Sequence, residues 1–291
     1  MLTKQEAKRL DKFYTKKEVA EKLLKTTKEI LNLNGEELFL EPSAGNGVFV
    51  KLIKNIDAYD LAPEYKNIKK ANFLEVKLKE KNYITIGNPP FGNRCNLAID
   101  FFNKCANHSK IIAFIVPITF LKWSVQSQLN EDFKLVYFEE LKENSFTLLN
   151  EEYNIRCCFQ IWVLNNTYPN LKNFRIMTRP AISHSDFLIW QHNATEASRK
   201  YVDEDWEIAT WRQGYKNYNE IFTREDYDWL REQVYNTNLQ FFYIKPLTKK
   251  SREVINKMDF NKLARRNMRT PGFGKGDFVA YYNELLLLEE E

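Results

Sequence analysis

Long apolar runs are missing from the sequence, which has 291 residues. A helix that crosses a bilayer needs about 20 consecutive apolar residues, and no run here approaches that length. The opening segment, MLTKQEAKRLDKFY, is charged from its fourth residue and does not match a secretory signal. We therefore expect a cytoplasmic protein that does not contact a membrane.

Cysteine and histidine are also scarce. The chain has three histidines and four cysteines, and the cysteines form no C-x-x-C pair. Side chains that are spread in this way do not predict a metal site. The simpler interpretation is that Cys95, Cys105, Cys157 and Cys158 are reduced thiols in or near the core, as in other cytosolic proteins.

A large excess of charge of one sign is missing too, since the net charge is only +4. Basic residues are nevertheless concentrated late in the chain. Residues 245–275 hold ten Lys or Arg against two acids, Glu253 and Asp259. Such a cluster favours a polyanionic partner. The alternative interpretation is a basic helix face that is merely solvated.

Strand and helix patterns alternate over the first 165 residues, which predicts a mostly parallel α/β sheet. In FYTKKEVAEKLLKTTKEIL, apolar residues at helical spacing predict a helix that opens with a capping box between Thr15 and Glu18. LFLEPSAGNGVFVKLI reads as strand, turn and helix. FKLVYFEE and YNIRCCFQIWVL predict an antiparallel pair that closes one edge of the sheet.

The polar, turn-rich stretch NNTYPNLKN, residues 165–173, ends this pattern. We therefore predict a Rossmann-like α/β domain over residues 1–168 and a smaller mixed domain over residues 169–291.

A small-residue turn follows the first strand of this pattern. Ala44, Gly45 and Gly47 would let a ligand approach the backbone, and Asp60 ends the next strand, where an acid can bind ribose hydroxyls. The turn begins with another acid, Glu41, which would repel a pyrophosphate. A carboxylate at this point favours a cationic ligand, and S-adenosylmethionine carries both an ammonium and a sulfonium group.

The tetrapeptide Asn88-Pro89-Pro90-Phe91 follows the strand YITIG, at the edge where open α/β sheets bind ligands. Two successive prolines make the turn rigid and hold Asn88 in an extended conformation. The Asn88 side-chain oxygen and the Pro89 carbonyl are acceptors beside an aromatic ring. This arrangement suits the amino group of a planar base.

Taken in order, FYTKKEVAEKLL, EPSAGNG, Asp60 and NPPF resemble the N6-adenine DNA methyltransferases of the group whose cofactor motifs precede the catalytic motif. The resemblance covers roughly residues 11–165. It implies the class I methyltransferase sheet, with S-adenosylmethionine as cofactor, although many relatives have Asp where this chain has Asn72. The implied cofactor-binding residues are Tyr14, Thr15, Glu41, Ala44, Gly45, Gly47, Asp60, Asn72 and Phe73.

The same resemblance implies that Asn88, Pro89, Pro90 and Phe91 are catalytic, and that a flipped-out adenine stacks on Phe91 and Phe146. Residues 169–291 would recognise double-stranded DNA, and a cognate restriction endonuclease is a conceivable partner. The candidate phosphate contacts are Lys249, Lys250, Arg252, Arg265, Arg266 and Arg269.

Three alternatives stay open at this point. The acceptor can be an RNA adenine or the side-chain amide of a protein glutamine, because the N-P-P-aromatic turn suits any conjugated –NH2 group. The third alternative is a catalytically inactive subunit that only binds nucleic acid.

Overall fold

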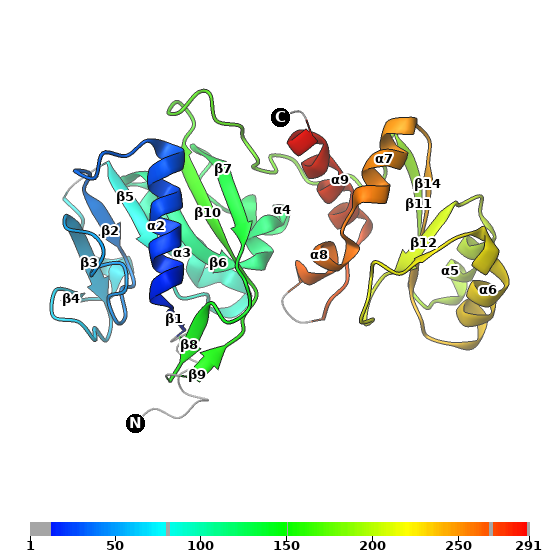
Figure 1. The fold of residues 1–291 in the computed structure, drawn as a ribbon, viewed down its shortest axis with the longest axis horizontal. Helices are drawn as coiled ribbons and strands as arrows, with labels where there is room; N and C mark the ends of the chain where they lie inside the picture. The colour runs from blue at the N-terminus through cyan, green and yellow to red at the C-terminus, as the bar shows by residue number, and fades with distance from the viewer. Residues whose placement is uncertain (1–12, 80–81, 150, 268–269, 290–291) are drawn as a thin grey trace. The chain divides into compact units, whose positions relative to one another are not determined.

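The computed structural model describes residues 13–79, 82–149, 151–267 and 270–289, and Figure 1 shows their elements in order. The chain divides into two compact units. The first holds the described residues up to Phe120 together with Ser124–Arg175, and the second holds Leu121–Trp123 and the chain from Ile176 onward. The sequence analysis predicted a division between residues 168 and 169.

A seven-stranded sheet forms the centre of the first unit, in the order β4-β3-β2-β5-β6-β10-β7. Its strands are parallel except for β10, which runs antiparallel to both β6 and β7. The strand bounds are β2 (Phe39–Glu41), β3 (Ile56–Asp60), β4 (Lys69–Lys70), β5 (Tyr83–Gly87), β6 (Ser109–Pro117), β7 (Phe133–Glu140) and β10 (Cys157–Leu164).

This order and these directions confirm the predicted fold class, a Rossmann-like class I methyltransferase sheet with an antiparallel pair at one edge. The chain builds outward from β2 to β4 and then returns to place β5 on the other side of β2. The carboxyl ends of β2 and β5 therefore flank the point where strand order reverses, which is where such sheets bind ligands.

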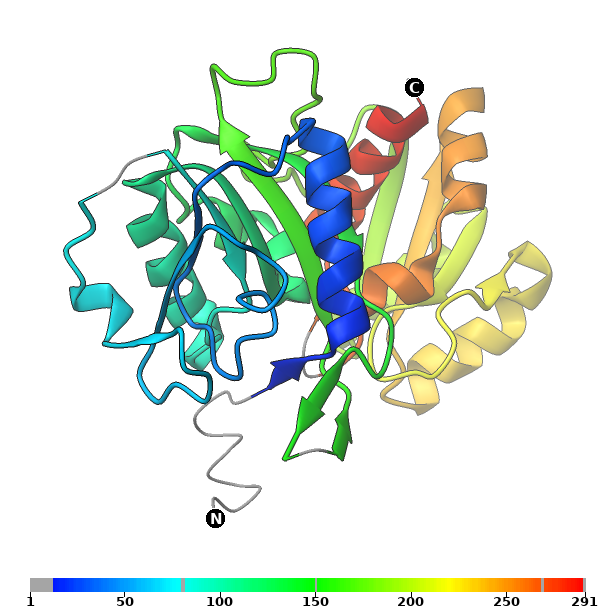
Figure 2. The same ribbon diagram turned by 60° about the vertical axis from the view of Figure 1, so that its left-hand side comes forward.

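Helices cover both faces of the sheet. Helix α2 (Lys17–Leu31) packs buried leucines against Ile84 and Ile111 on one face. On the other face, Phe102 of α3 (Asn96–Ala106) contacts the rings of Phe114 and Trp162 edge-on. Figure 2 shows α2 in front of the sheet and the strands behind it. The long apolar strands are buried because a helix covers each side.

The predicted capping box is wrong. Helix α2 begins after Lys16, whose side chain makes no cap, and Thr15 belongs to the short strand β1 (Tyr14–Thr15). Strand β1 pairs with β8 (Phe146–Leu148), which pairs in turn with β9 (Glu151–Tyr153). Residue 15 is thus part of a strand pair, and its Oγ1 makes no capping bond to the helix.

The helix predicted after the glycine turn is also wrong. Residues 45–52 form successive turns, in which the Gly47 N–H donates to the Ala44 carbonyl and the Lys51 N–H to the Gly47 carbonyl. Gly45 and Gly47 have φ values of +50° and +74°. These values are confined to the turn itself, and beyond it the Leu52 N–H donates to the Phe49 carbonyl, only three residues back, so the bonds do not continue as a regular helical ladder.

Arg175 closes the first unit from a segment that has no regular structure. Its guanidinium is buried and donates to the carbonyls of Gln126, Leu129, Asn130 and Phe133. Through these four bonds it joins the end of α4 (Trp123–Gln126) to the start of β7.

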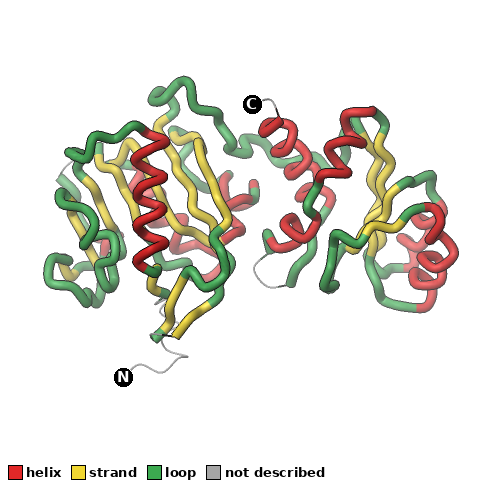
Figure 3. The backbone as a smooth tube through the Cα atoms, viewed as in Figure 1, coloured by secondary structure: helices red, strands yellow, loops and turns green. Residues whose placement is uncertain are grey.

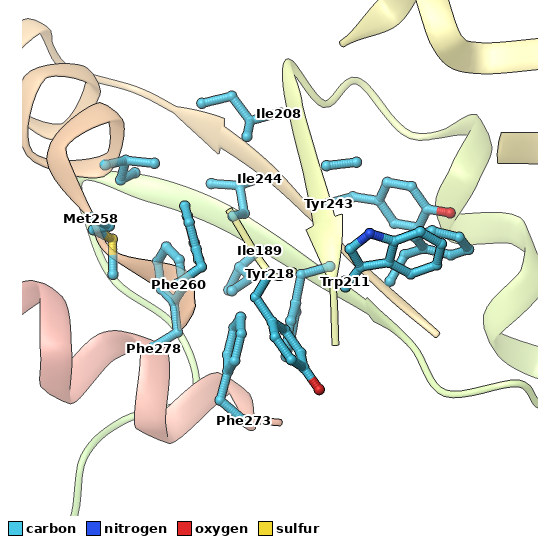
Figure 4. Packing of buried hydrophobic residues seen from close by; sticks show 14 of the residues in the cluster. Ile189, Ile208, Trp211, Tyr218, Tyr243, Ile244, Met258, Phe260, Phe273 and Phe278 are labelled. Atoms are coloured by element: carbon cyan, nitrogen blue, oxygen red, sulfur yellow. The ribbon is translucent and has the colours of Figure 1, made fainter. Parts of the chain in front are cut away.

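The second unit is built on an antiparallel sheet in the order β11-β14-β12-β13. Figure 4 shows its core, in which Phe260, Phe273 and Phe278 lie beside Ile244 and Tyr218. In Figure 3 the helices of the second unit, drawn in red, lie beside the yellow strands of this sheet. The elements are β11 (Phe187–His192), α5 (Glu196–Arg199), β12 (Ile208–Trp211), β13 (Ile221–Phe222), α6 (Tyr227–Asn236), β14 (Phe241–Pro246), α7 (Lys249–Lys257), α8 (Phe260–Arg265) and α9 (Lys275–Glu289).

Among the described residues, no helix is long and apolar enough to cross a membrane. In the same part of the chain, no group of three or more His, Cys, Asp or Glu side chains is placed to hold a metal ion. All four cysteines are buried, and none of them forms a disulfide with another described residue.

Candidate active site

A cavity of about 370 Å³ opens at the carboxyl edge of the central sheet. It lies where the ends of β2 and β5 meet, and six segments of the first unit line it. Ten of the predicted site residues are among its lining, namely Tyr14, Thr15, Glu41, Ala44, Gly45, Asp60, Asn72, Phe73, Asn88 and Pro90.

Four other predicted residues are not part of this lining. Pro89 is buried behind it, and the rings of Phe91 and Phe146 are 4% and 1% exposed within the apolar core. Gly47 shapes the turn instead, because a Cβ there would lie 2.9 Å from Cβ of Tyr65.

The glycine turn is fastened to the end of β3. The Gly45 N–H donates to Oδ2 of Asp60 at 2.8 Å, and the Ala62 N–H donates to Oδ1 at 2.7 Å. A carboxylate has about four acceptor positions, so Asp60 can still bind hydroxyl groups in the cavity. Leu61, the next residue, is 67% exposed and adds an apolar surface that the sequence analysis missed.

Tyr14 covers the same turn from β1. A Cβ at position 45 would lie 2.9 Å from Cε1 of Tyr14, so this close approach requires glycine. The Tyr14 hydroxyl donates to Glu64, and burial and this carboxylate raise its pKa. Glu64 is 50 positions away in the chain, and no sequence signal identified it.

Phe73 lines the cavity from the start of a short 3₁₀ helix, Phe73–Glu75, which begins three residues after β4 ends. Its ring is 2% exposed and lies 5.9 Å from the Tyr59 ring and 5.5 Å from the Phe101 ring, measured between centroids. Asn72 donates from its amide to Glu75, which orients the amide oxygen. Phe101, from α3, is a lining residue that sequence reasoning missed.

Glu41 is the most unusual residue of the cavity. It is 2% exposed, and its Oε2 atom has no hydrogen-bond partner in the described part of the chain. Burial raises the pKa of this carboxyl well above its usual value, the charge of Asp60 adds to that effect, and a backbone hydrogen bond at Val50 opposes it. No basic side chain in the described ranges is paired with Glu41, which leaves a place for a cation beside the two acids.

Replacing Glu41 with glutamine is expected to stabilise the ligand-free protein. The pKa of Glu41 is higher in the folded state than in the unfolded state, so the folded protein keeps this proton up to a higher pH. The free energy of unfolding therefore falls as pH rises above the unfolded pKa near 4.5. The free energy of unfolding of Glu41→Gln should exceed that of the wild type by about 1–3 kcal/mol near pH 8, and the gap should narrow toward pH 5. Urea titrations at several pH values measure this gap, and a gap that does not change with pH would contradict the assignment.

Asn88 directly follows the last residue of β5, and one end of its side-chain amide is hydrogen-bonded. Its Nδ2 donates to the Phe13 carbonyl at 2.9 Å, and Oγ of Ser43 donates to the Asn88 carbonyl at 3.1 Å. The bond to Phe13 fixes which end of the amide is the acceptor. The other end, Oδ1, is buried and has no partner among the described residues.

Oγ1 of Thr15 is a third buried polar atom without a described partner. Thr15, Glu41 and Asn88 all line the same cavity. Buried polar atoms are almost always paired, so three unpaired ones around one cavity indicate a polar ligand.

The basic candidates of the second unit differ in what they contact. Arg252 pairs with Glu207, and Arg269 lies outside the described residues. Arg266 is 4% exposed, and its guanidinium donates twice to Glu284 at 2.7 Å. The prediction that Arg266 contacts phosphate is therefore wrong, because a buried guanidinium cannot reach a nucleic acid. Three candidates are solvent-exposed, namely Lys249, Lys250 and Arg265.

No protein-family model and no curated protein sequence matches this chain. Similar solved structures include a Pyrococcus horikoshii protein provisionally described as an RNA methyltransferase, at 16% identity and a TM-score of 0.41, over 50% of this chain and 84% of that one. Another is a Listeria monocytogenes protein provisionally assigned as a class I S-adenosylmethionine-dependent methyltransferase. It has 11% identity and a TM-score of 0.43, over 58% of this chain and 64% of that one. At such identities the likeness is one of fold alone.

Proposed function

We propose that this protein is an S-adenosylmethionine-dependent methyltransferase that methylates N6 of adenine in double-stranded DNA. The observation that carries this proposal is the Asn88 amide. Its nitrogen is fixed by the Phe13 carbonyl, while its oxygen is a buried acceptor without a described partner in the cavity. An acceptor held in this way calls for a ligand that donates hydrogen bonds, and the amino group of adenine does so.

The cavity residues fit the proposed cofactor. The unpaired Oε2 of Glu41 can accept from an ammonium group, and Gly45 lacks the Cβ that would lie 2.9 Å from the Tyr14 ring. Asp60 retains acceptor positions for ribose hydroxyls, and Phe73 and Leu61 offer apolar surface for an adenine. When bound there, the cofactor supplies an electrophilic methyl group.

The residues after β5 would prepare the acceptor amine. Oδ1 of Asn88, which has no partner among the described residues, and the Pro89 carbonyl can each accept one hydrogen of an –NH2 group. Two acceptors on these hydrogens draw the nitrogen lone pair out of conjugation with the ring. The rigid proline pair fixes both acceptors before the base arrives, so catalysis is mainly positioning and electrostatics. The nitrogen can lose its extra proton to water once it is methylated.

The second unit favours nucleic acid over a protein acceptor. Lys249 and Lys250 are exposed at the start of α7, and Arg265 is exposed at the end of α8. These side chains can contact phosphates without reading sequence. The target adenine would leave the helix at a cost of a few kcal/mol.

Incubation with labelled S-adenosylmethionine tests this function. Duplex DNA, RNA of the same sequence and a protein extract serve as separate acceptors, and each product is digested and examined by mass spectrometry. We expect N6-methyladenine from the DNA. Label only in RNA nucleosides or in glutamine would replace the DNA assignment, and no label in any acceptor would reject the enzyme.

A further inference from the structure

Arg212 is a partly buried arginine of the second unit that has no acidic partner among the described residues. It directly follows β12, and its Nη1 atom donates to the side-chain oxygens of Gln213, at 3.3 Å, and of Gln240. Nε is buried and has no described partner, and Nη2 donates to no described residue either. Burial lowers the pKa of this guanidinium, and no carboxylate opposes that effect. The edge formed by Nε and Nη2 is therefore left for a ligand.

Lys275, the first residue of α9, is a second partly buried cation of the same unit. Its ammonium group makes no hydrogen bond and no ion pair with any described residue. Burial lowers the pKa of this ammonium group, again with no acid to oppose the effect. The nearest acid along the chain, Asp277, is already engaged, because it accepts from the Gly274 N–H at 3.0 Å and pairs with Lys122 at 3.0 Å. Both cations thus lack a counter-charge in the described part of the chain.

The backbones of the two segments that carry these cations are joined. The Phe273 N–H donates to the Arg212 carbonyl at 3.2 Å, and Gln213 pairs with Gly272 in an isolated antiparallel bridge. Gly272 has a φ of +147°, and a Cβ there would lie 2.8 Å from the Arg212 carbonyl oxygen. This close approach requires glycine. Lys275 follows Phe273 by only two residues, so both cations belong to one local structure.

Residues 212–216 and 272–275, here called the loop pair, are held in place by further contacts. The Gly214 N–H donates at 3.3 Å to the carbonyl of the residue that precedes the second segment. The Tyr215 ring stacks on the Trp211 ring, with 3.6 Å between their centroids and an angle of 18°. These contacts fix the backbone on both sides of Arg212, so its position does not depend on a bound ligand.

A phosphate group has the charge and the geometry that the loop pair lacks. Nε and Nη2 of an arginine point in the same direction and can donate to two oxygens of one phosphate, and an ammonium group adds a second positive charge. A partly buried cation without a counter-charge costs free energy that a bound anion regains. The simpler explanation is a pair of solvated surface cations. That explanation does not account for a buried N–H without an acceptor, since buried donors are almost always paired.

We propose that the loop pair binds a phosphate group of the DNA backbone, with the Nε–Nη2 edge of Arg212 as the bidentate donor and Lys275 as the second positive charge. This inference rests on the proposed function, because it takes the DNA of that reaction as the source of the phosphate. It assigns two residues that the sequence analysis did not name. A phosphate contact of this kind positions the duplex without reading its sequence.

Binding of duplex DNA by Arg212→Met tests the site. Fluorescence anisotropy with a short labelled duplex of mixed sequence gives the Kd at several salt concentrations, and no recognition sequence is needed for a backbone contact. We expect the Kd to rise about 10-fold at moderate salt, and the slope of log K against log salt to become shallower by about 0.9. Lys275→Met should change both quantities in the same direction. The double variant should weaken binding by less than the product of the two single effects, because both side chains hold one group.

Arg212→Lys separates charge from geometry. Lysine keeps the positive charge, so the salt slope should stay near that of the wild type, but an ammonium group cannot bind two oxygens as the arginine fork does, so the Kd should rise. The matched control is Arg231→Met, which removes an exposed arginine that already pairs with Asp203 at 3.5 Å. This control should leave both the Kd and the slope unchanged.

Thermal unfolding without DNA distinguishes binding from a structural role. Arg212→Met removes a charge that has no counter-charge, so its Tm should equal or exceed that of the wild type. A lower Tm together with an unchanged Kd would mean that Arg212 only supports the fold, and would overturn the site. If Arg212→Met does not fold, Arg212→Lys and Lys275→Met decide the question.

The remaining outcomes separate this site from the proposed function. Wild-type Kd and slope in both Met variants, or a double variant whose effect equals the product of the single effects, would overturn the shared site alone. If the wild type binds duplex DNA but methylates no acceptor, the proposed function fails and the phosphate site stands, whereas a wild type that binds no DNA refutes both. Calorimetry with inorganic phosphate alone should show no binding. Phosphate binding that Arg212→Met abolishes, with the Kd for DNA unchanged, would assign the loop pair to a free phosphate compound instead.

Discussion

Replacing Asn88 with alanine is expected to lower kcat for methylation by about 10²–10³-fold, the usual effect of removing one preorganised polar group from a reaction centre. The variant loses the buried oxygen that has no described partner, and with it the acceptor proposed for the amino group. Binding of S-adenosylmethionine should change little, because Glu41, Gly45 and Asp60 remain in place. Single-turnover methylation and calorimetry with the cofactor separate the two effects.

Asn88→Asp is the matched control for this experiment. Aspartate keeps an oxygen at the acceptor position but cannot donate to the Phe13 carbonyl as Nδ2 does. Its activity should lie between that of the wild type and that of Asn88→Ala. If Asn88→Ala keeps the wild-type kcat with the same acceptor, Asn88 is not the catalytic acceptor, and the proposed chemistry fails.

Arg175→Met is expected to lower the free energy of unfolding of the first unit by about 3–5 kcal/mol, because buried carbonyls then lose a charged donor. The guanidinium donates to four backbone carbonyls at 2.7 to 3.0 Å and lies 5.6 Å from the centroid of the Trp162 ring. Methionine fills similar space but donates to none of them. Urea unfolding followed by far-UV circular dichroism measures the loss.

Lysine at the same position provides the comparison. Arg175→Lys keeps the charge, but a single ammonium group cannot span four carbonyls in the fork geometry of arginine. We expect an intermediate loss of stability. A Met variant as stable as the wild type would mean that the four carbonyls do not depend on Arg175.

Much of the fold followed from local sequence patterns. The apolar spacing from residue 17 to residue 31 gave α2, and the apolar run at residues 109–117 gave the buried strand β6. The two predictions that were wrong, the capping box at Thr15 and the helix after Gly47, both overlooked a constraint on the backbone. Pairing with β8 extends residue 15, and after the glycines the backbone bonds shorten from four residues at Lys51 to three at Leu52, so the segment stays a series of turns.

Much of the candidate site was also predictable, because its residues occur in short motifs at strand ends. Glu41, Asp60 and Asn88 each end or follow a strand, and parallel strands bring their carboxyl ends to one edge. Strand periodicity and turn chemistry are properties of neighbouring residues, so the sequence alone could place these three side chains around one cavity.

Only the tertiary structure decided which distant groups meet these residues. It brought the Phe13 carbonyl to Asn88, Glu64 to Tyr14 and Glu284 to Arg266. Contacts of this kind join segments far apart in the chain, and no local pattern encodes them. The sequence by itself determined that an acidic turn and an Asn-Pro-Pro-Phe turn share one sheet edge, because both turns follow parallel strands. The folded chain decided which of their oxygen atoms stay unpaired, because pairing depends on every segment that packs against them.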